Sequence, residues 1–413
     1  LGNGIDPEEM CNKFGADVLR LWVSSCDYSQ DVSISENILK QVSDAYRRFR
    51  NTFRFLLGNL NDFTPDDFVE DWDALEPLDQ WALVRLSQLL ADVEASYESY
   101  RFNSVYRALY DYVNDISAVY MDVTKDRLYA EAPASPRRRA VQTVLMNILE
   151  VLVRVMAPIL SFTTDEVWEC YPPAFRAIEG REASVQLAGW PCARDFVPSL
   201  PADAGAQVAT MEEMMAVREV VTKALEEARN EKIIGKSQEA SLTVTAPAAL
   251  VATAGSFDPA VFEELFIVAK VQFVEGDGDE ITAAVTVAEG EKCPRCWNIR
   301  ELGGNPNHPD VCERCGDALG RHSGRGRVSG RPRDVNHRER ARGGLCRGGE
   351  ASQPAQAQRR HLRSSCRAVA CPRYRHESLL QRLLRGPGSG WSLSWSGAVP
   401  PGAQHRCRLG YVR

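Results

Sequence analysis

The chain has 413 residues, of which 44% are hydrophobic and 25% are charged, so it is long enough for two or three packed domains. It has no uncharged apolar run of about 18 residues and opens on Leu1-Gly2-Asn3 without a basic and then apolar leader, which excludes a transmembrane helix and a signal peptide. Its net charge of −7 combines a basic tail with a body at 1–320 whose net charge is −23, which argues against a broad cationic clamp for nucleic acid. We therefore expect a cytoplasmic protein whose sequence begins inside a longer one.

Helical periodicity dominates the first 160 residues. Apolar residues spaced by threes and fours predict helices at about 38–60, 83–97, 105–123 and 141–156. The last of these follows Ser135-Pro136, which supplies an N-cap and a proline at the first helical position. Four long helices with short connections predict a mainly α protein built on an antiparallel helix bundle at 36–195, preceded by a connecting segment at 1–35.

Arginines cluster beside two of the predicted apolar stripes. The first helix carries Arg47, Arg48, Arg50 and Arg54, and the fourth begins with the run 137–139, which is all arginine. Such basic strips favour contact with phosphates, although a merely solvated helix face explains them equally well. We predict that Arg47, Arg48 and Arg54 contact nucleic acid, together with the run at 137–139.

A second domain follows a boundary rich in proline and alanine. Gly189-Trp190-Pro191 and the stretch up to about residue 206 interrupt the helical pattern. A helix is then predicted from 211 to 230, and alternating apolar residues at 242–246 and 281–287 predict strands, with a further β-rich run at 266–274. These elements predict a small α+β domain at 207–288.

Four cysteines form the most specific motif of the sequence. Cys293-Pro294-Arg295-Cys296 is separated by 15 residues from Cys312-Glu313-Arg314-Cys315. Two C-x-x-C turns at this spacing are typical of one structural zinc ion held by four thiolates, with no coordination position left for catalysis. Disulfides are the alternative, which a reducing cytosol disfavours. We predict a zinc-binding knuckle at 289–320.

Side chains around this knuckle are suited to RNA. Trp297 directly follows the first turn, and Arg295, Arg300 and Arg314 lie close in the sequence. An aromatic ring and nearby cations can stack on unpaired bases and pair with phosphates. The alternative for Trp297 is that it fills the core of a very small domain. The sequence has no nucleotide-binding or zinc-protease motif and no histidine before His308, so we assign no catalytic residue.

The tail at 321–413 holds 20 arginines, no lysine and 4 acidic residues. A disordered basic arm that binds nucleic acid is one explanation. We favour another, translation of a GC-rich gene in the wrong reading frame, because the arginines are scattered among Gly, Pro and Ser without an apolar period. Under either explanation we predict a disordered basic tail without a fold.

Taken in order, several motifs resemble the class I aminoacyl-tRNA synthetases, and most closely the bacterial isoleucyl-tRNA synthetases. The resemblance covers about residues 1–320 and rests on the opening Leu1-Gly2-Asn3, the four cysteines, and the segments 15–22, 79–81, 125–129, 156–160, 165–168 and 233–240. In that family Leu1 would directly follow the Lys-Met-Ser-Lys-Ser loop that binds ATP. The resemblance therefore implies a C-terminal fragment that starts just after this loop.

The family's known activity then implies a role in translation. The intact enzyme activates isoleucine with ATP and Mg²⁺, transfers it to tRNA(Ile) and removes mischarged valine, and the sites for these steps would lie upstream of Leu1. What remains would be the anticodon-binding bundle and a zinc knuckle that hold tRNA(Ile), in a monomeric protein without membrane contact. A free-standing zinc-ribbon protein that binds nucleic acid without enzymatic activity is the alternative.

Overall fold

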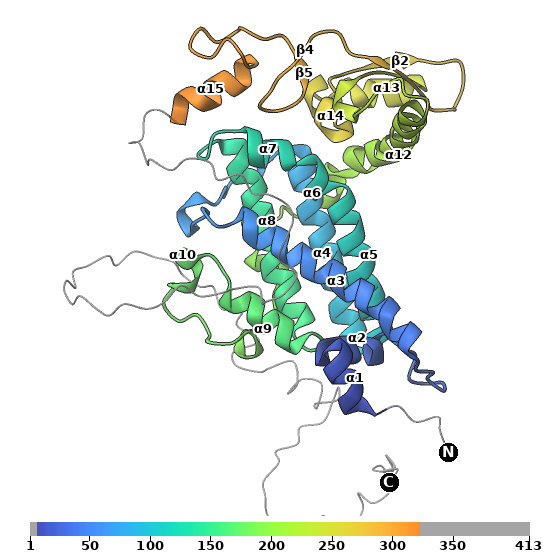
Figure 1. The fold of residues 1–413 in the computed structure, drawn as a ribbon, viewed down its shortest axis with the longest axis vertical. Coiled ribbons are helices and arrows are strands. Elements are labelled where there is room, and N and C mark those ends of the chain that lie inside the picture. The colour runs from blue at the N-terminus through green and yellow to red at the C-terminus, as the bar shows by residue number, and fades with distance from the viewer. Residues whose placement is uncertain (1–5, 323–413) are drawn as a thin grey trace, which may run out of the picture.

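The computed structural model describes residues 6–322, and the predicted basic tail lies almost wholly outside these residues. Four long helices run side by side along the long axis of the molecule (Figure 1). They are α3 (Glu36–Asn59), α4 (Pro77–Glu98), α5 (Phe102–Ala118) and α8 (Pro136–Met156). The predicted helix bundle is thus present.

Helix α8 forms the centre of the bundle. Every residue from 140 to 156 is buried except Glu150 and Arg154, so apolar side chains pack against it from all sides. The sequence predicted its start correctly, because Ser135 is the N-cap residue and Pro136 occupies the first turn. The Ser135 hydroxyl, however, donates to Glu131 and makes no capping bond to the helix backbone.

The third predicted helix is interrupted, whereas the pattern predicted a single helix to residue 123. Helix α5 ends at Ala118, and Val119 leaves the helical region with φ −106° and ψ −80°. The chain continues as the short helices α6 (Tyr120–Val123) and α7 (Lys125–Ala130). Apolar residues on both sides of the break are buried and keep the helical spacing, which explains why periodicity alone did not reveal it.

Short elements surround the bundle. Two helices, α1 (Pro7–Phe14) and α2 (Ala16–Ser25), pack at one end of it (Figure 1). Two 3₁₀ turns, η1 (Pro65–Asp67) and η2 (Trp72–Ala74), connect α3 to α4. After α8 the chain forms α9 (Ser161–Glu169), α10 (Pro173–Arg176), η3 (Val185–Leu187), η4 (Ala193–Asp195) and α11 (Ala204–Gln207), and η5 (Ser237–Glu239) lies further along the chain.

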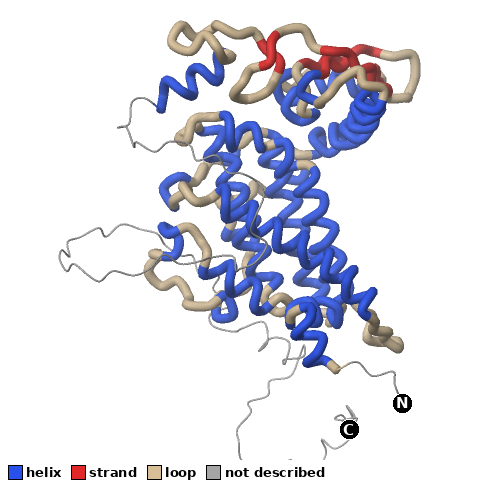
Figure 2. The backbone as a smooth tube through the Cα atoms, viewed as in Figure 1, coloured by secondary structure: helices blue, strands red, loops and turns tan. Residues whose placement is uncertain are grey.

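A small α+β unit lies at the opposite end of the bundle (Figures 1 and 2). It comprises α12 (Ala209–Asn230), β1 (Ala240–Ala246), α13 (Ala248–Ala254), α14 (Pro259–Phe266), β2 (Lys270–Glu275) and β3 (Thr282–Val287). The sheet order is β2-β1-β3, with β1 parallel to β2 and antiparallel to β3. Alternate residues of β1 are buried, as the two-residue alternation predicted.

One strand prediction was partly wrong. The β-rich run at 266–274 is a strand only from Lys270, since Phe266 is the last residue of α14. Asp258 caps that helix by accepting from the Ala260 amide, and Pro259 occupies its first turn, so local capping determines the helix. Ile267 then ends α14 in the left-handed region, at φ 57°.

The last described segment contains β4 (Glu291–Lys292), β5 (Ile299–Arg300) and α15 (Glu313–His322). One continuous apolar core runs from the bundle into the α+β unit, whereas the cysteines of this last segment form a separate small cluster. Within residues 6–322 no helix has the length and apolar character needed to cross a membrane.

Candidate metal centre and nucleic-acid interface

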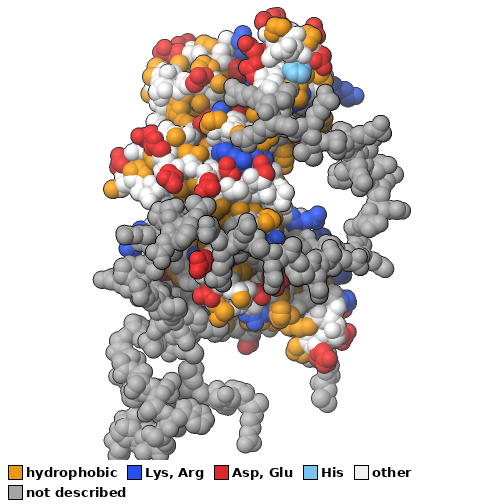
Figure 3. All heavy atoms as spheres, turned by 90° about the vertical axis from the view of Figure 1, so that its left-hand side faces the viewer, with side chains coloured by type: hydrophobic (Ala, Val, Ile, Leu, Met, Phe, Trp, Pro, Cys, Tyr) orange, Lys and Arg blue, Asp and Glu red, His pale blue; other side chains and the backbone are white. Residues whose placement is uncertain are grey.

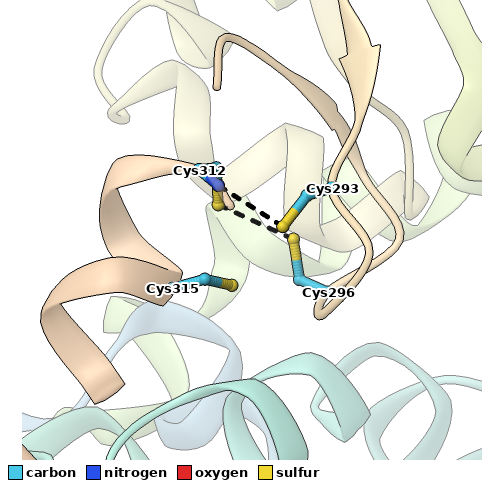
Figure 4. Close-up of side chains that lie close together, drawn as sticks. All are labelled: Cys293, Cys296, Cys312 and Cys315. Atoms are coloured by element: carbon cyan, nitrogen blue, oxygen red, sulfur yellow. Dashed lines mark hydrogen bonds between the residues drawn. The ribbon is translucent and has the colours of Figure 1, made fainter. Parts of the chain in front are cut away.

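The four predicted cysteines converge at one point (Figure 4). Cys293 and Cys296 lie in the turn between β4 and β5, Cys312 directly precedes α15, and Cys315 lies in its first turn. All four side chains are buried, and their sulfur atoms lie within 4.8 Å of one another. Two turns far apart in the sequence thus present four sulfur ligands to a common centre.

The geometry fits a tetrahedral zinc site. The Sγ atoms of Cys296 and Cys312 are 3.8 Å apart. A tetrahedron with zinc–sulfur bonds of about 2.3 Å has edges of about 3.8 Å, whereas a disulfide requires about 2.05 Å. All four cysteines are free thiols, and the Cys312 amide donates to the Cys293 sulfur over 3.5 Å. A four-thiolate site leaves no position for water, so the ion it fits is structural.

Backbone hydrogen bonds close the first of the two turns. The Cys293 amide donates to the Asn298 carbonyl oxygen over 3.0 Å, and the Trp297 amide donates to the Cys293 carbonyl oxygen over 2.9 Å. The position directly after the last cysteine, Gly316, has no room for a side chain. A Cβ atom at Gly316 would lie 2.5 Å from the Cβ atom of Asn305, well inside van der Waals contact.

The thiols are electrostatically coupled. A hydrogen bond with Cys315 raises the pKa of Cys296 to about 12, and the same bond lowers the pKa of Cys315. Four sulfur atoms at this separation cannot all carry charge without a cation between them. Zinc binding would therefore release protons, and zinc affinity should fall in acid.

The zinc knuckle is attached to the bundle through helix α7. The guanidinium of Arg314 forms a bidentate pair with Asp126, and Arg295 donates to the Ala130 carbonyl oxygen and to the Cys315 sulfur. Burial opposes the charged form of Arg314, yet its pKa is raised because Asp126 accepts its hydrogen bonds. These two predicted RNA ligands therefore already have partners within the chain.

Trp297 is exposed, which contradicts the alternative that it fills the core of the knuckle. The residue is 53% accessible to solvent, and the buried positions around the cysteines are filled by others, including Val311 and Ala130. The backbone of Trp297 adopts φ 65°, which is unusual for a bulky residue. The Nζ atom of Lys236 lies 4.6 Å from the centre of the indole ring, a cation–π contact that the sequence did not indicate.

The other arginines that we predicted to contact RNA differ in their exposure and in the partners they already have within the chain. On α3, Arg47, Arg48 and Arg54 are exposed, although Arg47 pairs with Asp44 at 3.0 Å. Near the knuckle, Arg300 pairs with Glu263 at 3.7 Å. The run at 137–139 is engaged in ion pairs with Glu76, Glu131, Glu264, Asp62 and Asp67. On the face drawn in Figure 3 acidic and basic side chains are interspersed.

A buried ion network links the bundle to the α+β unit, and the sequence analysis missed it. Arg127 of α7 is 2% exposed and pairs with Glu76, Asp79 and Glu264. Glu264 belongs to α14 and also pairs with Arg137. These partners lie 48 to 137 residues from Arg127 in the sequence, so no local spacing indicates them. The network joins α14 to the bundle, beside the apolar core that the two share.

Comparison with known proteins identifies two matching families. The profile of the anticodon-binding domain of tRNA ligase matches residues 79–244, and that of the zinc finger found in FPG and IleRS matches residues 290–317. The isoleucine–tRNA ligase of Syntrophomonas wolfei is 41% identical over 345 residues, which is 78% of this chain and 35% of that protein. The isoleucine–tRNA ligase of Symbiobacterium thermophilum is 43% identical over 333 residues, which is 76% of this chain and 34% of that protein.

The chain thus spans about a third of the length of the curated relatives it matches. Among solved structures, the LeuRS–tRNA–LeuAMS complex of Agrobacterium radiobacter aligns with 70% of this chain and 31% of its own, at 15% identity and a TM-score of 0.34. That likeness is too distant to place a tRNA on this chain.

Proposed function

Because the chain belongs to the isoleucyl-tRNA synthetase family, whose C-terminal anticodon-binding domain and zinc finger it matches, we propose that it binds the anticodon half of tRNA(Ile). It would act as part of a longer cytoplasmic isoleucine–tRNA ligase, in which other segments activate isoleucine with ATP and Mg²⁺. The contribution of the described residues is then to position the tRNA, which lowers the entropic cost of bringing its 3′ end to a distant active site.

The arrangement of the modules supports this proposal. Helices α1 and α2 lie at one end of the bundle, and the α+β unit and zinc knuckle lie at the other (Figure 1). An RNA bound along the bundle would therefore extend between the two ends. We propose functional divisions at 1–35, 36–195, 207–288 and 289–320, with the zinc ion shaping the last of them.

The exposure of Trp297 is the observation that supports a specific contact with the RNA. A closed four-thiolate site holds this tryptophan in a strained backbone conformation with half of its surface in solvent. An aromatic ring presented in this way can stack on an unpaired base, which contributes about 1–3 kcal/mol. The neighbouring Lys236 adds a positive charge for the phosphate backbone.

The test is a substitution in a full-length isoleucine–tRNA ligase that carries this C-terminal portion. Trp297→Ala should raise the KM for tRNA(Ile) by a factor equivalent to about 1–3 kcal/mol, with isoleucine activation by ATP unchanged. Trp297→Phe is the matched control, because it keeps an aromatic surface. Unchanged tRNA kinetics in Trp297→Ala would remove this residue from the interface.

A broader test uses the chain itself and asks whether it binds tRNA(Ile) in preference to other tRNAs at low salt. A preference for tRNA(Ile) is expected. Failure to bind any tRNA would leave the bundle and knuckle as a structural scaffold. Equal binding of unrelated nucleic acids would instead favour a free-standing zinc-ribbon protein.

A further inference from the structure

A small cavity lies where the bundle, the α+β unit and the zinc knuckle meet. Val123 of α6, Glu263 of α14 and Arg300 of β5 all line it, so each of the three modules contributes to its wall. Its volume is about 190 Å³, which is room for about six water molecules at about 30 Å³ each. This junction cavity therefore suits one small organic molecule and is too small for a nucleotide.

Positive and negative side chains line the junction cavity in equal numbers. Three guanidiniums and three carboxylates contribute to the wall: Arg137, Arg300, Arg314, Asp126, Glu263 and Glu264. Because these charges cancel, the wall does not favour a simple anion over a simple cation. A zwitterion, which carries both charges, is the kind of ligand that such a wall accommodates.

One of the three ion pairs is open. Two pairs are closed by hydrogen bonds of 2.6 and 2.9 Å, whereas the Nη2 atom of Arg300 lies 3.7 Å from the Oε2 atom of Glu263, too far for a hydrogen bond. The Arg300 guanidinium donates to no group of residues 6–322, and its buried Nε atom is without a partner. Burial raises the pKa of Glu263, and the charge of Arg300 offsets this only in part. A donor and an acceptor thus face the cavity with their hydrogen-bonding capacity unused.

Aliphatic side chains and amides complete the wall. Val123 and Val268 are buried, and Ile267 is half-buried at the end of α14 with φ 57°. The side-chain amides of Gln238 and Asn298 also line the cavity, and neither forms a hydrogen bond within the described part of the chain. An apolar wall with a few converging polar groups is typical of sites that bind small molecules.

We propose that the junction cavity binds a small zwitterion, a free α-amino acid with an aliphatic side chain. Its carboxylate pairs with Arg300, its ammonium group pairs with Glu263, and its side chain lies against Val123, Ile267 and Val268. The ligand completes the hydrogen bonds of the open pair, and such charge-assisted bonds are the strong ones. Because the wall comes from three modules, the bound amino acid links the knuckle to the bundle. Binding does not require RNA, so this site goes beyond the proposed function.

The first experiment is calorimetric titration of the full chain with L-leucine and with two analogues that each lack one charge. The compound 3-methylbutylamine keeps the ammonium group, and 4-methylpentanoate keeps the carboxylate. L-Leucine should bind with a dissociation constant of about 1 mM or lower. Each analogue should bind at least about tenfold more weakly, because it leaves one member of the open pair unmatched. L-Leucine should also raise the melting temperature in proportion to its occupancy of the site.

The second experiment removes one charge of the open pair at a time. Glu263→Gln and Arg300→Gln should each weaken L-leucine binding at least about tenfold. In Glu263→Gln the preference for L-leucine over 4-methylpentanoate should shrink, because the ammonium group has lost its partner. In Arg300→Gln the preference over 3-methylbutylamine should shrink for the corresponding reason. A merely structural role of these residues would leave both preferences unchanged.

Two control variants make the same chemical changes at exposed positions outside the cavity. Glu227→Gln lies on α12, and Arg107→Gln lies on α5. Both should bind L-leucine within about twofold of the unsubstituted chain. Zinc content and melting temperature are measured without ligand for all four variants and should match those of the unsubstituted chain. If a cavity variant fails to fold, the comparison of L-leucine with its two analogues on the unsubstituted chain still decides.

Three results would overturn the proposal. If L-leucine does not bind the unsubstituted chain, the cavity holds only water, and the proposed binding of tRNA is unaffected. If L-leucine binds but Glu263→Gln and Arg300→Gln behave as their controls do, the amino acid occupies another place. If either analogue binds as tightly as L-leucine, the ligand is not recognised as a zwitterion.

Discussion

Removing the guanidinium of Arg127 should destabilise the protein strongly. Arg127→Met keeps the length and apolar stem of the side chain but leaves Asp79 and Glu264 buried without this partner. Asp79 is 0% exposed and cannot be solvated by small movements, whereas Glu264 is 13% exposed and keeps Arg137 as a partner. Breaking a buried ion pair by removing one partner costs about 3–5 kcal/mol, which at about 2–4 °C per kcal/mol lowers the melting temperature by about 6–20 °C.

The loss should depend on pH in a defined direction. Burial already raises the pKa of Asp79 despite the opposing charge of Arg127, and removing that charge raises it further. A carboxyl whose folded-state pKa lies above its unfolded-state pKa stabilises the fold when protonated. Stability of the variant should therefore fall as pH rises between those two pKa values. The gap between Arg127→Met and the original chain should be smaller at acidic than at neutral pH.

The assay is scanning calorimetry of the full chain and of two variants at several pH values. Arg107→Met serves as the matched control, because it makes the same change at an exposed position of α5 and should alter stability by about 0.5 kcal/mol or less. A melting temperature for Arg127→Met within 2 °C of the control's, taken as about 1 kcal/mol or less, would refute the reasoning. A penalty that grows toward acidic pH would refute the assignment of the effect to Asp79.

Three further outcomes are expected. Cys315→Ser or a strong chelator should remove a single zinc ion per chain and expose the segment after residue 289 to protease. The helical circular dichroism should persist because the bundle has its own core, and an intact knuckle without metal would contradict this prediction. Gly316→Ala should lower zinc affinity because of the overlap with Asn305, whereas Gly320→Ala on the same helix has open space and should not; competition with a chromogenic chelator measures both. In a plot of the logarithm of the tRNA binding constant against the logarithm of the salt concentration, Arg48→Gln should reduce the slope by about one unit. An unchanged slope would exclude a phosphate contact at Arg48.

Elements with strong local patterns were predictable from the sequence. The apolar stripe at 141–156 gave helix α8, and the alternation of Leu242, Val244 and Ala246 gave strand β1, because both periodicities reflect which side faces the core. The spacing of the cysteines likewise gave the metal centre, since two tight turns restrict four sulfur atoms to a single arrangement. In the helix and the strand the constraint lies within a few residues of chain, and in the metal centre it lies in two short turns of fixed spacing.

Features that depend on distant partners were not predictable in this way. The break at Val119 lies between two segments that are both buried, so the apolar period continues through it. The network around Arg127 joins residues from α4, α7 and α14, and no single segment contains a pattern for it. The contact of Lys236 with Trp297 depends on how the loop after α12 returns to the knuckle. Such contacts become visible only when tertiary structure is known.

Contacts with distant partners also decide which arginines remain candidates for RNA contact. From the sequence, the run at 137–139 and the strip on α3 are equivalent basic clusters. In the structure the run faces Glu76, Glu264 and Asp62, so moving these guanidiniums to a phosphate would leave carboxylates unpaired, some of them buried. Arg48 and Arg54 on α3 carry no such penalty, because their side chains are exposed and Arg48 donates only to a neutral amide. RNA contact by cations should therefore concentrate on α3 and beside Trp297.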